Sequence, residues 1–202
     1  MKCRTRLIAS FATSACFVFA LMLPTPAEAV PDLTGLSIAV DYLYPDLSTL
    51  LTHDDVTVGA GTEILCPGDA AELCTNIFDP NNTPASLDLS SNTIHFGNPL
   101  GASFSPGAFN GLRFSGLGGS GLWAGFSLST NYAGLDNSRV TLAGGDVLSV
   151  NLQGILFPGG EGGQFFEITL LPQRVVPEPA VLLLLGLGLM FVAMRVRARR
   201  RL

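Results

Sequence analysis

The clearest indication of the fold is the stretch Arg139-Val-Thr-Leu142, Gly144-Gly-Asp146 and Val147 to Leu156. β-branched and apolar residues favour strands, and glycine with aspartate favours a tight turn between them. This stretch therefore predicts two strands joined by a turn. Similar short runs recur along the chain, separated by Gly, Asn, Asp and Pro. We expect further strands at 36–44, 56–58, 63–66, 86–89, 93–96, 111–114, 123–129 and 165–170.

Residues 30–173 show no convincing amphipathic helix between these runs. Many short strands with frequent turn residues are typical of all-β proteins, so we expect a single β-sandwich or jelly-roll-like domain. A domain of this length is large enough for one hydrophobic core. Val56-Thr-Val58 and Glu63 to Cys66 flank Gly59-Ala-Gly61, and this arrangement predicts a hairpin or a bulge.

The predicted domain is strongly acidic. Residues 30–174 hold fourteen Asp and Glu against three Arg, a net charge of −11, although the whole chain has a net charge of −5. Nucleic-acid binding is excluded, because phosphate contacts need clustered Lys and Arg. An acidic surface also repels anionic polymers unless divalent cations bridge the two. Solubility alone is the simpler explanation of the charge.

Residues 1–29 have the three parts of a secretory signal peptide. A basic start at residues 1–6 precedes an uncharged apolar run at 7–23. Small residues follow at Ala27 and Ala29, where they fit the cleft of a signal peptidase. A retained N-terminal transmembrane helix is the alternative.

Residues 174–202 have the composition of a membrane anchor with a charged end. The fifteen residues from Ala180 to Met194 are uncharged and mostly Leu, Val, Ala and Gly. As a helix they would span about 22 Å, so flanking residues must complete a crossing of the ~30 Å hydrocarbon core. The arginines that follow should stay cytoplasmic, which agrees with export of the preceding domain. A buried core helix is the alternative. The arginines are Arg195, Arg197, Arg199, Arg200 and Arg201.

The tripeptide Pro177, Glu178 and Pro179 precedes this anchor. Tripeptide, apolar run and arginine cluster, together with the N-terminal signal peptide, resemble the PEP-CTERM sorting signal of Gram-negative bacteria. The resemblance implies processing near the tripeptide by an exosortase, a membrane cysteine protease or transpeptidase. It also implies a transient single-pass intermediate in the inner membrane, followed by delivery to the cell surface or the extracellular space. Such proteins occur in bacteria that make exopolysaccharide, and several are tied to biofilm. A stiff linker is the plain alternative for the tripeptide, because its prolines hold it extended.

Three segments of the predicted domain resemble a recurring region of uncharacterised PEP-CTERM proteins: Phe109 to Phe114, Asn131 to Thr141 and Val150 to Gly154. The resemblance implies a β-rich exported module and no particular activity. Asn151 and Gln153, two residues apart, would share one face of a strand. With Tyr132 or Trp123 nearby they form a candidate sugar site, although solvent-exposed polar strand positions explain them equally well.

Two cysteines remain after removal of the signal peptide, Cys66 and Cys74. In an oxidising compartment such a pair predicts a disulfide that closes a short loop. A redox or metal pair is the alternative, but those sites prefer two intervening residues and further His or Cys partners.

No motif in the chain predicts a catalytic, cofactor-binding or metal site. The two histidines are His53 and His95, and no Gly-x-Ser-x-Gly stretch supports a serine triad. His53-Asp-Asp55 could supply metal ligands, but an exposed loop is the expected structure there. Asp79 to Pro84 has alternating oxygen ligands as in calcium loops, but it lacks the glycine and glutamate of an EF-hand, and its prolines favour a plain turn.

We therefore expect a protein without enzymatic activity or cofactor that is structural or adhesive in an exopolysaccharide biofilm. Its expected partners are signal peptidase, exosortase, the inner membrane and extracellular polysaccharide. A secreted carbohydrate- or calcium-binding module is the alternative, and a secreted hydrolase comes third.

Overall fold

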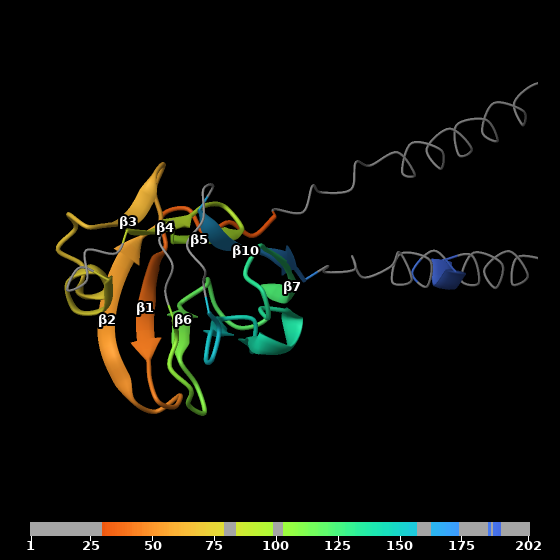
Figure 1. The fold of residues 1–202 in the computed structure, drawn as a ribbon. Helices are drawn as coiled ribbons and strands as arrows, with labels where there is room; N and C mark the ends of the chain where they lie inside the picture. The colour runs from red at the N-terminus through yellow and green to blue at the C-terminus, as the bar shows by residue number, and fades with distance from the viewer. Residues whose placement is uncertain are drawn as a thin grey trace, which may run out of the picture. The chain divides into compact units, whose positions relative to one another are not determined.

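The computed structural model describes residues 30–78, 84–98, 103–156, 163–173, 186 and 188–190. Within them, ten strands form two five-stranded antiparallel sheets (Figure 1). The helical elements between the strands are η2 (Leu73–Phe78), a π-helix, and η4 (Asn137–Arg139), a 3-10 helix. The strands are β1 (Ser37–Leu43), β2 (Leu50–Thr57), β3 (Thr62–Cys66), β4 (Ala85–Leu89), β5 (Thr93–Asn98), β6 (Gly111–Ser115), β7 (Trp123–Thr130), β8 (Val140–Ala143), β9 (Val147–Asn151) and β10 (Gln164–Pro172).

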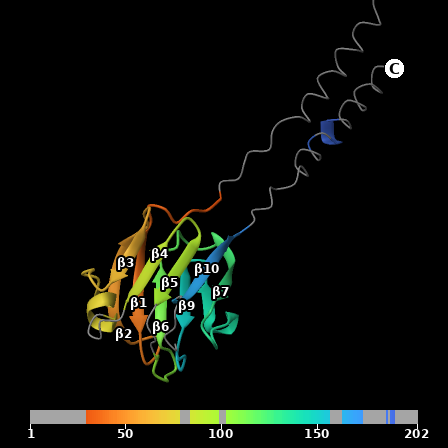
Figure 2. The ribbon, with the colours of Figure 1, turned by 45° about the horizontal axis from the view of Figure 1, so that its top comes forward.

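The strand order is β2-β1-β6-β9-β8 in the first sheet and β3-β4-β5-β10-β7 in the second. Figure 2 shows the second sheet in this order, with β7 at its edge beside β10. The all-β prediction and the sandwich are thus confirmed. The ten strands exceed the eight of a jelly roll.

Alternation along the strands builds the core between the sheets. In β1, Ile38, Val40 and Tyr42 belong to the buried core, while the residues between them face outward. The second sheet contributes large aromatic residues, and the rings of Phe96 and Phe166 stack with centroids 5.2 Å apart. Since one face of each sheet is apolar and the other is polar, charged side chains can occupy the outer faces.

The predicted hairpin at 139–156 is present as β8 and β9, which pair with Leu142 opposite Leu148. Its turn consists of Gly144, Gly145 and Asp146, and both glycines have positive φ (61° and 72°), a conformation that glycine adopts without steric cost. The second strand is shorter than expected, because β9 ends at Asn151.

The segment at Gly59-Ala-Gly61 is not a hairpin turn, so the hairpin alternative of the prediction was wrong. β2 is an edge strand of the first sheet and β3 an edge strand of the second, so this segment carries the chain from one sheet to the other. The preceding strand was also expected to be much shorter than β2, because the acidic pair Asp54-Asp55 interrupts the apolar pattern.

The signal-peptide range 1–29 and most of the range 174–202 lie outside the described residues, as does the candidate calcium loop at 79–83. Residues 186 and 188–190 are helical. Within the part of the chain that the structure describes, no helix is long and apolar enough to cross a membrane.

Candidate functional site

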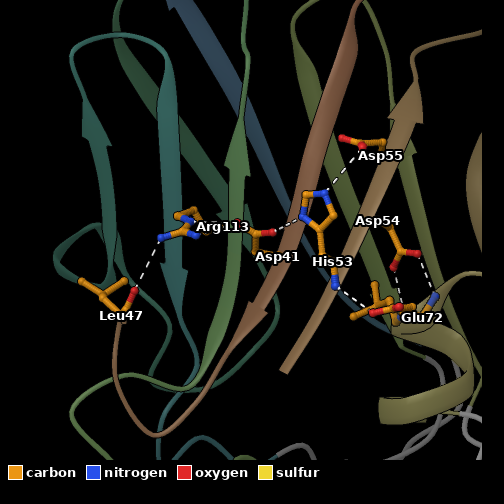
Figure 3. Close-up of polar contacts among 8 residues, drawn as sticks. Asp41, Leu47, His53, Asp54, Asp55, Glu72 and Arg113 are labelled. Atoms are coloured by element: carbon orange, nitrogen blue, oxygen red, sulfur yellow. Dashed lines mark hydrogen bonds and ion pairs between the residues drawn. The ribbon is translucent and has the colours of Figure 1, made fainter. Parts of the chain in front are cut away.

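A row of polar side chains crosses the outer face of the first sheet. The register of β1 places Asp41 opposite His53 of β2 on one side and opposite Arg113 of β6 on the other. Figure 3 shows the Asp41 carboxylate between the His53 imidazole and the Arg113 guanidinium. The expectation that His53-Asp-Asp55 forms an exposed loop was therefore wrong, because these residues belong to β2.

Asp41 is the centre of the row, and its side chain is only 7% exposed. Its Oδ2 accepts hydrogen bonds from Nε and Nη2 of Arg113, at 3.0 and 2.7 Å. Its Oδ1 lies 2.7 Å from Nδ1 of His53. A carboxylate with so little contact with water needs these partners, because a buried unpaired charge is strongly destabilising.

His53 also lies between two carboxylates. Its Nε2 is 3.5 Å from Oδ2 of Asp55, on the side opposite to Asp41 (Figure 3). The hydrogen bond to Asp41 is the main cause that raises the pKa of His53. Desolvation opposes it, and the negative charges of Asp41 and Asp55 add to the upward shift. About half of the His53 side chain remains exposed, so a proton can reach the ring from solvent.

A second group of contacts joins β2 to the π-helix. The carboxylate of Asp54 accepts hydrogen bonds from the amides of Glu72 and Leu73, at 2.7 and 2.8 Å. In return, Oε2 of Glu72 accepts the amide of His53 at 3.2 Å. Asp54 thus satisfies the free amides at the start of η2, and Glu72 satisfies a backbone donor of the edge strand (Figure 3).

The disulfide between Cys66 and Cys74 joins η2 to the second sheet. Cys66 ends β3 of the second sheet, and Cys74 lies in the first turn of η2. This confirms the disulfide prediction. Because Asp54 and Glu72 bind the helix to the first sheet, η2 connects the edges of both sheets.

His95 lies on the outer face of the second sheet, whereas His53 lies on the outer face of the first. In the register, Asp88 of β4 and Glu167 of β10 stand on its two sides. Its Nδ1 is 3.6 Å from Oε2 of Glu167, and its ring stacks on Phe165 with centroids 5.5 Å apart. The two histidines therefore belong to separate surfaces. Among the described residues, no group of three or more His, Cys, Asp or Glu side chains is placed to hold a metal ion.

The candidate sugar site at Asn151 and Gln153 is not formed. Trp123 is buried and its Nε1 donates to the carbonyl of Leu117 at 2.6 Å, so its ring offers no exposed platform. Tyr132 is also buried. Asn151 ends β9 while Gln153 lies in the following turn, and Oδ1 of Asn151 accepts the Gln153 amide at 3.1 Å.

Asp41 and Arg113 were missed as site residues by sequence reasoning. Each is a lone charge between core residues of a predicted strand, which is the available signal for an outward-facing position. Their pairing depends on β1 and β6 being neighbours, and the local sequence does not contain that information.

The remaining predicted residues lie outside the described part of the chain, and their roles stay predictions: Ala27, Ala29, Pro177, Glu178, Pro179 and the five arginines from Arg195 to Arg201.

Comparison with known proteins identifies one segment. Residues 175–201 match a family model described as the PEP-CTERM protein-sorting motif. No curated protein and no solved structure matches the chain. The motif implies export, a membrane-anchored intermediate and processing by an exosortase. The chain therefore carries a PEP-CTERM protein-sorting motif, which follows directly on the last strand of the β-sandwich.

Proposed function

We propose that this protein is a structural or adhesive component of an extracellular polysaccharide matrix, delivered there by exosortase processing. The observation that carries the proposal is the match of residues 175–201 to the PEP-CTERM protein-sorting motif. In this proposal signal peptidase removes residues 1–29, and the apolar run at 180–194 holds the chain briefly in the inner membrane of a Gram-negative cell. The exosortase then acts near Pro177-Glu-Pro179.

The folded domain supports a role outside the cytoplasm. A disulfide is retained in oxidising compartments and is rare in the reducing cytoplasm. The Cys66–Cys74 bond links the edges of the two sheets through η2, so an exported domain is stabilised where chaperones of the cytoplasm are absent.

We further propose that the domain acts without catalysis. The two histidines lie on the outer faces of different sheets, so no described surface combines them. Both carboxylate oxygens of Asp41 already have a partner, Oδ1 in His53 and Oδ2 in Arg113, as expected of a structural ion pair.

The test is the intact mass of the mature protein from its native host, with its C-terminal peptide sequenced. We expect a C-terminus near residues 177–179 and a product in the extracellular polysaccharide fraction. The variant Glu178→Ala should keep residues 180–202, because the tripeptide loses its charged group. The matched control Glu167→Ala changes a surface glutamate of β10 outside the motif and should be processed normally.

Two results would overturn the proposal. Normal processing of Glu178→Ala would count against recognition of the tripeptide. A mature mass that still includes Leu202 would indicate a permanent anchor in the inner membrane, and the matrix role would then be rejected.

A further inference from the structure

The four edge strands of the sandwich differ in how they are protected. These edges are β2 and β8 in the first sheet, and β3 and β7 in the second. The free edge of a strand exposes backbone donors and acceptors that can pair with another chain, and proteins usually block such edges with charges, bulges or short strands.

Three of the edges carry such protection. In β2, the amide of His53 is bonded to Glu72, and Asp54 and Asp55 add negative charge. In β3, the amide of Leu65 donates to Oδ2 of Asp69 at 2.5 Å. The third, β8, has only four residues.

β7 has a bulge at Ala124 near its start, but its residues 125–130 have none of these devices. It is eight residues long, reads Trp-Ala-Gly-Phe-Ser-Leu-Ser-Thr, and contains neither a charge nor a proline. It runs along the outer side of β10, as Figure 2 shows. An uncharged edge of this length is the kind of strand to which another strand adds.

The direction of its backbone groups follows from one bond next to the strand. The amide of Asn131 donates to the carbonyl of Phe165 in β10 at 3.3 Å. In an antiparallel pair alternate residues bond to the partner, so Ser129, Ser127 and Gly125 also face β10. The backbone groups of Phe126, Leu128 and Thr130 consequently point to the free edge, and they have no hydrogen-bond partner among the described residues.

The sequence of β7 is complementary to itself in one antiparallel register. With Ser127 on a two-fold axis, Phe126 of one copy stands opposite Leu128 of the other, and these are the residues whose backbone groups point outward. Both side chains pack partly against the core, so pairing continues the apolar inner face from one copy into the next. On the outer face, Ser127 of one copy lies opposite Ser127 of the other, and Ser129 lies opposite Gly125.

Charge selects this edge for a second copy of the same chain. Residues 30–174 have a net charge of −11, so two copies repel each other wherever acidic edges such as β2 and β3 would approach. β7 offers a contact without charges. The start of the strand is already covered, because an added Cβ at Gly145 of the β8–β9 turn would lie 2.7 Å from the carbonyl of Trp123. The free part is therefore centred on residues 126–130.

We propose that two copies of this protein associate through β7, antiparallel and with Ser127 on the two-fold axis, so that the two five-stranded sheets become one continuous sheet. The interaction adds a homotypic contact to the exported domain and does not depend on a role in the polysaccharide matrix.

Cysteine substitution tests the register in the full chain, extracted in mild detergent after export. Ser127 of each copy would form a non-hydrogen-bonded pair, whose Cβ atoms lie about 4.5–5.5 Å apart, close enough for a disulfide after a small shift. Ser127→Cys should give a disulfide-linked dimer under mild oxidation. Ser129→Cys is the matched control on the same face of the same strand. Its two copies would be about 13 Å apart, so it should give no more dimer than the wild-type chain.

Lysine substitution tests the association itself. Ser127→Lys places two positive charges opposite each other and should weaken the dimer about fivefold in sedimentation, whereas Ser129→Lys faces Gly125 and should leave it unchanged. Both side chains are exposed, and unaltered circular dichroism serves as the control for folding. A monomeric wild-type chain, equal cross-linking of both cysteine variants, or a dimer insensitive to Ser127→Lys would each overturn the proposal.

Discussion

The carboxylate of Asp41 binds Arg113 through a single oxygen, Oδ2, and leaves Oδ1 for His53. Because the Asp41 side chain is almost completely buried, loss of the guanidinium leaves a charge that water cannot solvate. We expect Arg113→Met to lower the free energy of unfolding by about 2–3 kcal/mol in urea denaturation. The double variant Asp41→Asn/Arg113→Met removes the orphaned charge and should recover part of that loss. A stability of Arg113→Met equal to that of the wild type would contradict this account.

The His53–Asp41 contact predicts a pH dependence of stability. The pKa of His53 is raised in the folded state, chiefly by the hydrogen bond to Asp41. The protonated ring therefore contributes stability that is fully present below the unfolded pKa of about 6.5, and that is lost as pH rises through the folded pKa. An NMR titration should give a His53 pKa above its ordinary value, and Asp41→Asn should lower that pKa, because it removes the largest cause of the shift. An unshifted titration in the wild type would refute the prediction.

Removal of the disulfide should destabilise the domain measurably. Cys66 and Cys74 are eight positions apart, and closing a loop of this size lowers the entropy of the unfolded chain by an amount worth about 2–3 kcal/mol. We expect a loss of this order in Cys66→Ala/Cys74→Ala by chemical denaturation. Reducing agent should destabilise the wild-type chain but not the variant, which provides the internal control. Equal sensitivity of both proteins to reductant would argue against the bond.

The two glycines of the β8–β9 turn offer a matched pair. Both have positive φ, but an added Cβ at Gly145 would lie 2.7 Å from the Trp123 carbonyl, while one at Gly144 meets nothing within 4 Å. Gly144→Ala should cost about 1 kcal/mol for its backbone conformation alone. Gly145→Ala should cost clearly more, because the turn must move away from β7. Thermal unfolding of the two variants distinguishes these cases, and equal losses would show that the close approach is unimportant.

The sequence predicts where individual strands lie better than it predicts which strands pair in the sheets. Alternation of apolar residues located β1 and β6, and turn residues located the β8–β9 hairpin, because these signals are local. The acidic pair Asp54-Asp55 interrupts the apolar pattern of β2, so the full length of this strand was not predicted. Asp54 binds an amide at the start of η2, and Asp55 contacts His53. The apolar pattern reveals neither contact. The Asp41–Arg113 pair could not be predicted for the same reason, as it joins residues 72 positions apart.

The sandwich also has a mechanical consequence. The first and last of the described strands lie inside their sheets: β1 lies between β2 and β6, and β10 lies between β5 and β7. The sorting motif at 175–201 follows β10, so tension applied at that end acts along a strand bonded on two sides. Inter-strand hydrogen bonds run perpendicular to the strands, and a pull along β10 therefore loads both rows together in shear instead of peeling them one at a time. Such a domain should resist unfolding when it is pulled from its C-terminal end.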